Sequence, residues 1–80
     1  MAAEDRISIT VKLFAFFRDN RFIKQEQEFP AQTTVRDIII FQGIKPEEVG
    51  VTMINSRQCT LDRIPVQGDQ LAVFPIIGGG

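Results

Sequence analysis

The residues with the clearest chemical potential are the last three, Gly78, Gly79 and Gly80, which directly follow an apolar run over residues 71–77. Because glycine has no Cβ, three in a row make a thin, flexible tail that can enter a narrow channel. Three extended residues reach about 10 Å. Such a tail would present the carboxylate of Gly80 inside another protein's active site. The alternative is an ordinary frayed terminus, but frayed ends are usually polar and mixed, and we favour a functional tail.

Side chains that commonly perform chemistry are scarce in this sequence. There is no histidine, which removes the commonest general base and the commonest metal ligand. A single cysteine, Cys59, leaves no set of zinc ligands, and we expect it to be a half-buried apolar side chain rather than a reactive thiol. Glu47 and Glu48 fall in an expected surface turn, where solvated charge is the simplest interpretation. No helix follows the glycines to bind a phosphate. We therefore do not expect a self-sufficient enzyme.

Length, charge and hydropathy limit the classes of protein further. Eighty residues make one small domain. The net charge is −1 and the basic residues do not cluster, so nucleic acid and anionic membranes are poor candidates for partners. No apolar run approaches the ~20 residues that span a bilayer, and residues 1–6 do not resemble a signal peptide. One cysteine cannot form an internal disulfide, which fits a reducing cytoplasm.

Two strands are expected in the first part of the chain. Clean alternation over residues 7–14 predicts a half-buried strand. Residues 15–17 either prolong this strand or bend away from it. Residues 22–29 predict a more polar second strand toward an edge of the sheet, where charge discourages unwanted pairing. The residues expected on the core face of the first strand are Ile7, Ile9, Val11 and Leu13.

One short helix is expected in the middle of the chain. Thr34 and Asp37 have the spacing of a helix cap, with a hydroxyl at the first position and an acid three residues later. Gly43 is placed to end the helix. Three consecutive isoleucines would also suit a strand, but the cap and the glycine favour a helix. The residues expected on its buried face are Val35, Ile38 and Ile39, with Ile40 and Phe41 widening that face.

The remaining elements predict a two-layer α+β domain. A single turn is expected over residues 45–49, a third strand over residues 51–55 and a minor strand over residues 58–60. A tight turn at residues 67–69 precedes the last strand, which starts at Gln70. That strand is apolar enough to be central, beside the first and parallel to it. One sheet then covers one helix around a single core.

Five stretches of this sequence, taken together, match a known family. They are Val11-Lys12-Leu13-Phe14-Ala15, Thr34-Val35-Arg36-Asp37-Ile38, Ile54-Asn55, Gly68-Asp69 and Phe74-Pro75-Ile76-Ile77-Gly78-Gly79-Gly80. Over nearly its whole length the chain resembles the MoaD/ThiS family of ubiquitin-like sulfur carrier proteins. The family's terminal Gly-Gly pair falls on Gly79 and Gly80. Gly78 departs from the usual Ala or Ser, which lengthens the flexible tip by one residue.

The resemblance implies a β-grasp (ubiquitin-like) fold, with a mixed four- to five-stranded sheet packed on one main helix. Residues 1–77 would form the sulfur-carrier domain and residues 78–80 a flexible glycine tail. It also implies that an E1-like enzyme adenylates Gly80 at the expense of ATP and that the product becomes a thiocarboxylate. No cofactor would be bound by the chain itself, because the activating partner uses the ATP.

A docking surface is expected beside the tail. If Leu71 and Val73 face the core, Ala72 and Phe74 face outward, and Phe14 on the first strand lies near Phe74. All seven aromatic residues are phenylalanine, and rings without a polar group belong in a core or on a dry interface. The alternative is that a loop covers the pair. The expected docking residues are Phe14, Phe74, Pro75, Ile76 and Ile77.

The resemblance leaves several sulfur acceptors open. The long first hairpin and the Phe74-Pro75 ending look more like the molybdopterin branch, in which the tail inserts into the large subunit of molybdopterin synthase. The short helix and the segment after it look more like the thiamine branch, in which the acceptor is thiazole synthase, and another sulfur pathway is equally open. A protein modifier conjugated through Gly80 is a third possibility. A ubiquitin-like adaptor with an inert tail is the fourth.

Overall fold

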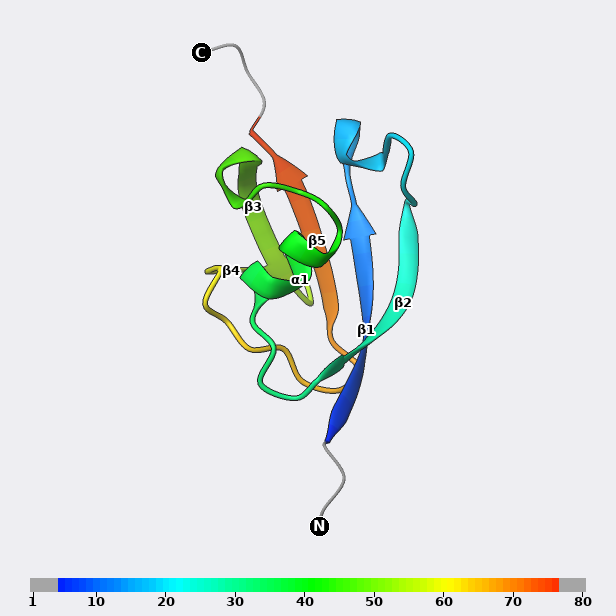
Figure 1. Cartoon of the computed structure of the whole chain (residues 1–80). Coiled ribbons are helices and arrows are strands. Elements are labelled where there is room, and N and C mark those ends of the chain that lie inside the picture. The colour runs from blue at the N-terminus through cyan, green and yellow to red at the C-terminus, as the bar shows by residue number, and fades with distance from the viewer. Residues whose placement is uncertain (1–4, 77–80) are drawn as a thin grey trace.

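A computed structural model describes residues 5–76 of the chain. It contains five strands, one α-helix and two short 3₁₀ helices (η), and Figure 1 shows α1 lying across one face of the sheet. In chain order the elements are β1 (Arg6–Leu13), η1 (Ala15–Arg18), β2 (Lys24–Pro30), α1 (Val35–Phe41), η2 (Pro46–Glu48), β3 (Val49–Ile54), β4 (Arg57–Cys59) and β5 (Gln70–Pro75). The two-layer α+β architecture expected from the sequence is confirmed.

The sheet is mixed, with the strand order β2-β1-β5-β3-β4. β1 and β5 are parallel, with Leu13 opposite Val73, and their arrows point the same way in Figure 1. β5 is antiparallel to β3, with Thr52 opposite Val73, and β1 is antiparallel to β2. The last strand is therefore central and lies beside the first, and the more polar β2 is at the edge, as predicted.

One hydrophobic core lies between the helix and the inner face of the sheet. The alternation in β1 is confirmed, because Ile9, Val11 and Leu13 are buried and Ile7 is partly buried against the same core. The strand positions between them face away from the core, so every second residue of β1 is available to an outer surface. The buried apolar residues are Ile9, Val11, Leu13, Phe17, Phe29, Val35, Ile38, Ile39, Ile44, Ile54, Leu71 and Val73.

The start of α1 is closed by the predicted cap. The Thr34 hydroxyl accepts a hydrogen bond from the Asp37 backbone N–H at 3.1 Å. The Asp37 carboxylate in turn accepts one from the Thr34 N–H at 3.3 Å. These reciprocal bonds satisfy N–H groups that have no partner within the helix. The hydroxyl–acid spacing therefore predicted the helix start correctly.

The end of α1 depends on a residue that is distant in sequence. Gly43 adopts a φ of +82°, which suits the residue that follows a helix, but no basic residue lies in the last helical turn. Arg21 supplies the missing donors, from Nε to Gln42 O at 2.9 Å and from Nη2 to Gly43 O at 3.2 Å. A helix of seven residues is too short to be stable alone, so the first hairpin helps to hold it. None of the described helices is long and apolar enough to cross a membrane.

The prediction that Ile40 and Phe41 widen the buried helical face is wrong. Ile40 is 53% exposed and Phe41 is 69% exposed, whereas Ile39 is fully buried. Successive helical residues are about 100° apart, so a run of apolar residues in a short helix cannot all face one sheet. Phe41 instead forms a T-shaped contact with Phe29, with ring centroids 5.4 Å apart and planes at 86°.

The chain after β1 bends away from the strand direction. Ala15 adopts a φ of +55°, an uncommon conformation for a residue with a Cβ. The turn continues into η1 and places Phe17 in the core, where only 1% of it is exposed. Of the two outcomes open for residues 15–17, the bend is the one observed.

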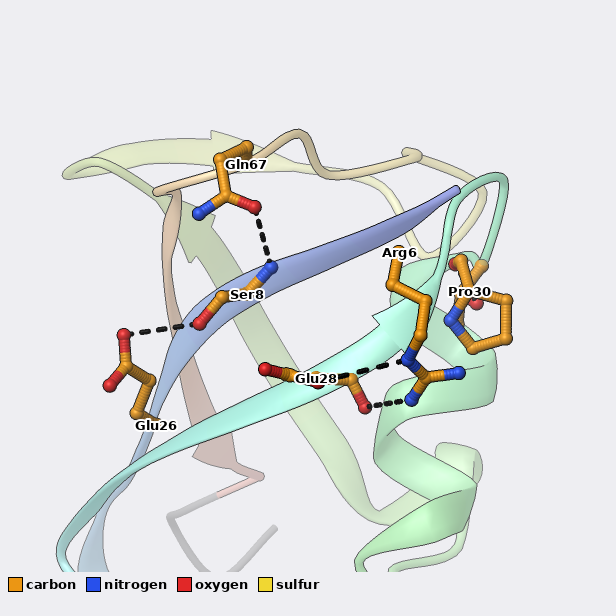
Figure 2. Close-up of polar contacts among 7 residues, drawn as sticks. Arg6, Ser8, Glu26, Glu28, Pro30 and Gln67 are labelled. Atoms are coloured by element: carbon orange, nitrogen blue, oxygen red, sulfur yellow. Dashed lines mark hydrogen bonds and ion pairs between the residues drawn. The ribbon is translucent and has the colours of Figure 1, made fainter. Parts of the chain in front are cut away.

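The outer face of the sheet is polar at the start of β1. Arg6 and Glu28 form an ion pair with a 3.8 Å separation, and Arg6 also donates to the Glu28 carbonyl. Ser8 donates from its hydroxyl to Glu26 at 3.1 Å and from its backbone N–H to Gln67 at 2.9 Å. Figure 2 shows these contacts joining β1, β2 and the segment before β5. This end of the outer face is thus occupied by charged and hydrogen-bonded side chains.

The contrast between Ile39 and Ile40 gives a matched test of the core. Ile39→Val removes one methylene from a fully buried site and should lower the free energy of unfolding by about 1 kcal/mol. Ile40→Val makes the same change in helix propensity at an exposed site and should lower it by less than about 0.5 kcal/mol. Urea denaturation at an unchanged m-value measures both. Equal losses from the two variants would contradict this placement of the helix.

Candidate functional site

The C-terminal tail leaves the domain from the end of the central strand. Pro75, the last residue of β5, lies opposite Val49. The N–H of Ile76 donates to the carbonyl of Glu48 at 3.0 Å, so the chain remains attached to the segment before β3 for one residue past the strand. Ile77, Gly78, Gly79 and Gly80, which include the predicted reactive residue, lie outside the described residues. The structure therefore describes the base from which the predicted tail departs.

Two phenylalanines stack beside this exit, as the sequence predicted. The rings of Phe14 and Phe74 lie 4.2 Å apart between centroids and are nearly parallel, at 14°. Both are half-buried. The Phe14 N–H donates to Val73 O at 3.2 Å, which fixes the end of β1 against β5 and brings the two rings together. The stack is thus held by backbone pairing as well as by ring contact.

Arg18 adds a positive charge to the aromatic stack. Its guanidinium carbon lies 5.2 Å from the centroid of the Phe14 ring, within the range of a cation–π interaction. Its Nε also donates to Leu13 O at 2.7 Å. The bend at Ala15 brings Arg18 back over the strand that precedes it. Arg18 is not among the residues that the sequence predicted for this surface, because the bend depends on a positive φ at Ala15.

Apolar side chains continue the stack across the outer face of the sheet. Val51 lies opposite Phe74, and Met53 lies opposite Ala72, and paired residues share a face of the sheet. All four are half-buried, while Thr52 between them is buried on the inner face. Val51 and Met53 were missed as candidate docking residues, although the alternation over residues 51–55 could have placed them. We call this surface the outer patch: Phe14, Val51, Met53, Ala72 and Phe74.

The predicted docking residues do not all present surface to a partner. Pro75 is buried, so in this structure it completes the strand end, contrary to the expectation that it lines the docking surface. Ile76 is 59% exposed and Phe16, in the adjacent η1, is 52% exposed. The accessible apolar surface at the exit therefore comes from the outer patch together with Ile76 and Phe16.

No arrangement for acid–base or metal chemistry is found in the described part of the chain. No pocket opens on residues 5–76, and no group of three potential metal ligands forms there. Glu47 and Glu48 are exposed in η2, as expected. Cys59 is half-buried and its thiol lies 3.5 Å from the Thr52 hydroxyl, consistent with the predicted structural role. The described residues instead present a partly exposed apolar surface beside the predicted tail.

A polar anchor fixes the start of β5 and therefore the position, along the strand direction, of the residues at its end. Asn55, in the turn after β3, donates from Nδ2 to Asp69 Oδ1 and accepts from the Gln70 N–H, both at 3.0 Å. Asp69 is 7% exposed, and its Oδ2 accepts from the Val66 N–H at 2.9 Å. Its carbonyl accepts from the Thr10 N–H at 3.0 Å. The anchor thus ties β5 to both of its neighbouring strands.

Comparison with known families yields a match, whereas comparison with curated proteins yields none. A family model described as the ThiS family matches residues 11–80. No curated protein matches the chain. The family match covers the last three residues of β1, all later elements and the terminal glycines.

Several solved structures are similar to this one. A protein assigned as molybdopterin converting factor subunit 1 of Pyrococcus furiosus is 26% identical, with a TM-score of 0.72 over 89% of this chain and 99% of that chain. Small archaeal modifier protein 1 of Haloferax volcanii is 18% identical, with a TM-score of 0.71 over 89% and 99% of the two chains. The HVO 2177 protein of Haloferax volcanii is 19% identical, with a TM-score of 0.76 over 100% and 94%. The likeness to the two Haloferax proteins shows the fold alone.

The polar anchor can be tested by exchanging its partners. Asn55→Asp replaces the donor that faces Asp69 with a second carboxylate and should lower the free energy of unfolding by about 1–3 kcal/mol. In the double variant Asn55→Asp/Asp69→Asn, residue 69 becomes the donor and still offers an oxygen to the Val66 N–H. Stability should therefore be largely restored, as measured by a double-mutant cycle in urea. Additive losses in the double variant would show that the two side chains are not coupled.

Proposed function

The chain belongs to the ThiS family, and on that premise we propose that it is a sulfur carrier protein whose C-terminal Gly80 is converted to a thiocarboxylate. Its mixed sheet packed on one helix is the β-grasp fold of these ubiquitin-like proteins. Small proteins of the MoaD/ThiS kind are generally not catalysts. The reactive group would be the chain's own carboxyl, acted on by other proteins.

The proposed activation has two balanced steps. A carboxylate oxygen of Gly80 attacks the α-phosphorus of ATP, forming an acyl–phosphate bond and releasing pyrophosphate. A hydrosulfide ion from the sulfur source then attacks the activated carbonyl, forming a carbon–sulfur bond, releasing AMP and a proton, and leaving the thiocarboxylate. The first step is needed because a free carboxylate would have to expel an oxide. The nucleotide and the sulfur donor belong to an E1-like adenylating enzyme and its sulfur source.

The observation that most supports this proposal is that the family match extends through the glycines to residue 80. The geometry at the base of the tail is compatible with it. β5 is held on both sides, and the outer patch lies beside the exit, so an enzyme that grips the patch has the tail close to its own active site. Aromatic residues at the centre of an apolar patch are typical of interface positions that dominate binding.

We propose molybdopterin synthesis as the first choice of pathway, with the large subunit of molybdopterin synthase as the sulfur acceptor. The similarity to the Pyrococcus furiosus protein assigned as molybdopterin converting factor subunit 1 supports this choice. The alternatives are thiazole synthase in thiamine synthesis, another sulfur pathway, or conjugation of Gly80 to other proteins. The modifier named among the structural neighbours makes conjugation an outcome that the experiment has to separate.

Intact-mass spectrometry tests the thiocarboxylate directly. After incubation with an E1-like enzyme, ATP and a sulfur source, the mass of the chain should rise by the difference between sulfur and oxygen. The untreated chain gives the mass of the native terminus and is measured first. A variant with one residue added after Gly80 is the control and should stay unmodified. If the mass is unchanged although the same enzyme modifies its own known carrier, the result would count against the proposal. High-mass conjugates that disappear when Gly80 is deleted would favour a protein modifier.

The outer patch can be tested by a matched pair of phenylalanine variants. Phe74→Ala removes half of the ring stack beside the exit and should weaken binding to the E1-like enzyme by roughly tenfold or more. Phe41→Ala removes a 69% exposed ring on α1 and should change the Kd by less than about twofold. Titration calorimetry measures both, and urea denaturation confirms that both variants remain folded. Equal effects on the Kd would contradict the assignment of the outer patch.

A further inference from the structure

Gly50 lies directly beneath the point where the tail leaves the sheet. It is the second residue of β3, at an irregularity in the β3–β5 register between Val49 and Val51. The backbone of Pro75 and Ile76 passes over it. A Cβ placed on Gly50 would lie 2.9 Å from Pro75 O and 3.2 Å from both the N and the Cα of Ile76. Because these are backbone atoms, no side-chain rotation relieves the contact.

The requirement for glycine at this position comes from the contact and not from the backbone conformation. Gly50 does not have the positive φ seen at Gly43 and Gly68. Gly68 shows the opposite situation, because its φ is +88° but a Cβ there would meet nothing within 4 Å. Substitution of Gly68 therefore strains the main chain, and substitution of Gly50 displaces the tail exit. The two glycines separate general instability from a local change at the exit.

We infer that Gly50 is a positioning residue for the tail, and that its lack of a side chain lets Ile76 bond to Glu48 and so sets where and in what direction the tail begins. This inference rests on the proposed function, since it assigns Gly50 a part in delivering Gly80 to the adenylating site. Residues 77–80 follow the Ile76–Glu48 hydrogen bond, which is the last one within the described part of the chain, and four fully extended residues reach roughly 14 Å. Release of that bond would move the last held residue back to the end of β5 and change the position and direction in which the chain continues after Pro75.

The state of the exit can be measured without any partner. NMR measures the hydrogen exchange of the Ile76 amide. In the unmodified chain this exchange should be slow, because the amide is hydrogen-bonded to the Glu48 carbonyl. Gly50→Ala should accelerate this exchange by roughly fivefold or more relative to the unmodified chain. Gly68→Ala should leave it within about twofold after correction for global stability from urea denaturation. Unaltered protection of Ile76 in Gly50→Ala would overturn the inference.

The consequence for delivery is measured as pyrophosphate release by the E1-like enzyme over a range of carrier concentrations. Gly50→Ala should lower kcat by roughly tenfold or more, because small misplacements of a reacting group are costly. The KM should stay within about twofold, because the outer patch is untouched. Gly68→Ala should leave both parameters near those of the unmodified chain. A variant that loses the Ile76 bond but keeps its kcat would also overturn the inference.

The two proposals fail in different ways. If the unmodified chain is never adenylated, the proposed function fails, and with it the role of Gly50 in delivery, while the amide exchange still decides whether Gly50 holds the exit. If the unmodified chain is adenylated and Gly50→Ala behaves like Gly68→Ala in both measurements, the proposed function stands and the role of Gly50 is wrong.

Discussion

The pairing of β5 on both sides is the constraint on which the rest of this structure depends. β5 is bonded to β1 along one edge and to β3 along the other, and Leu71 and Val73 on its inner face are fully buried. A slip of one residue would exchange its buried and outer faces. Neither neighbouring strand can move without breaking a ladder, so the position of Phe74 and the departure point of the chain are determined by backbone bonds.

This constraint explains how a chain with little side-chain chemistry can still present a defined site. Asn55, which is itself bonded to Asp69, accepts a hydrogen bond from the first residue of β5, and the bond from Ile76 to Glu48 holds the first residue after the strand. Between these two points the strand is paired along both edges, and the aromatic stack lies at its C-terminal end. The sheet fixes the position of this site. A larger protein, such as an enzyme, would instead position its site in a preformed cavity.

Local patterns predicted the elements well, because each depends on neighbours in the sequence. The alternation in β1, the Thr34–Asp37 cap and the central parallel β5 were all correct. The prediction failed at Ile40 and Phe41, where counting apolar residues ignored the rotation of the helix. Which isoleucine is buried depends on the direction from which the sheet approaches, and a sequence of consecutive isoleucines does not contain that direction.

The site was predicted less completely, because it is made by contacts between distant segments. The proximity of Phe14 and Phe74 followed from strand faces alone. Arg18 reaches the stack through a left-handed Ala15, which no residue preference would indicate. The close passage of Pro75 over Gly50 depends on an irregular register that only the assembled sheet reveals. Pro75 is buried because it shares the inner face of β5 with Leu71 and Val73.

The uneven polarity of the outer face restricts the orientation in which another protein can lie on it. At one end are Phe14 and Phe74; at the other, Glu26 and the ion pair of Arg6 with Glu28 already hold their partners (Figure 2). A partner protein with an apolar surface gains binding free energy by covering the end that carries Phe14 and Phe74. In the opposite orientation, the same partner would desolvate the charged side chains without forming compensating hydrogen bonds or ion pairs with them. The polarity of the sheet therefore selects one orientation of the partner before any contact with the terminal residues is made.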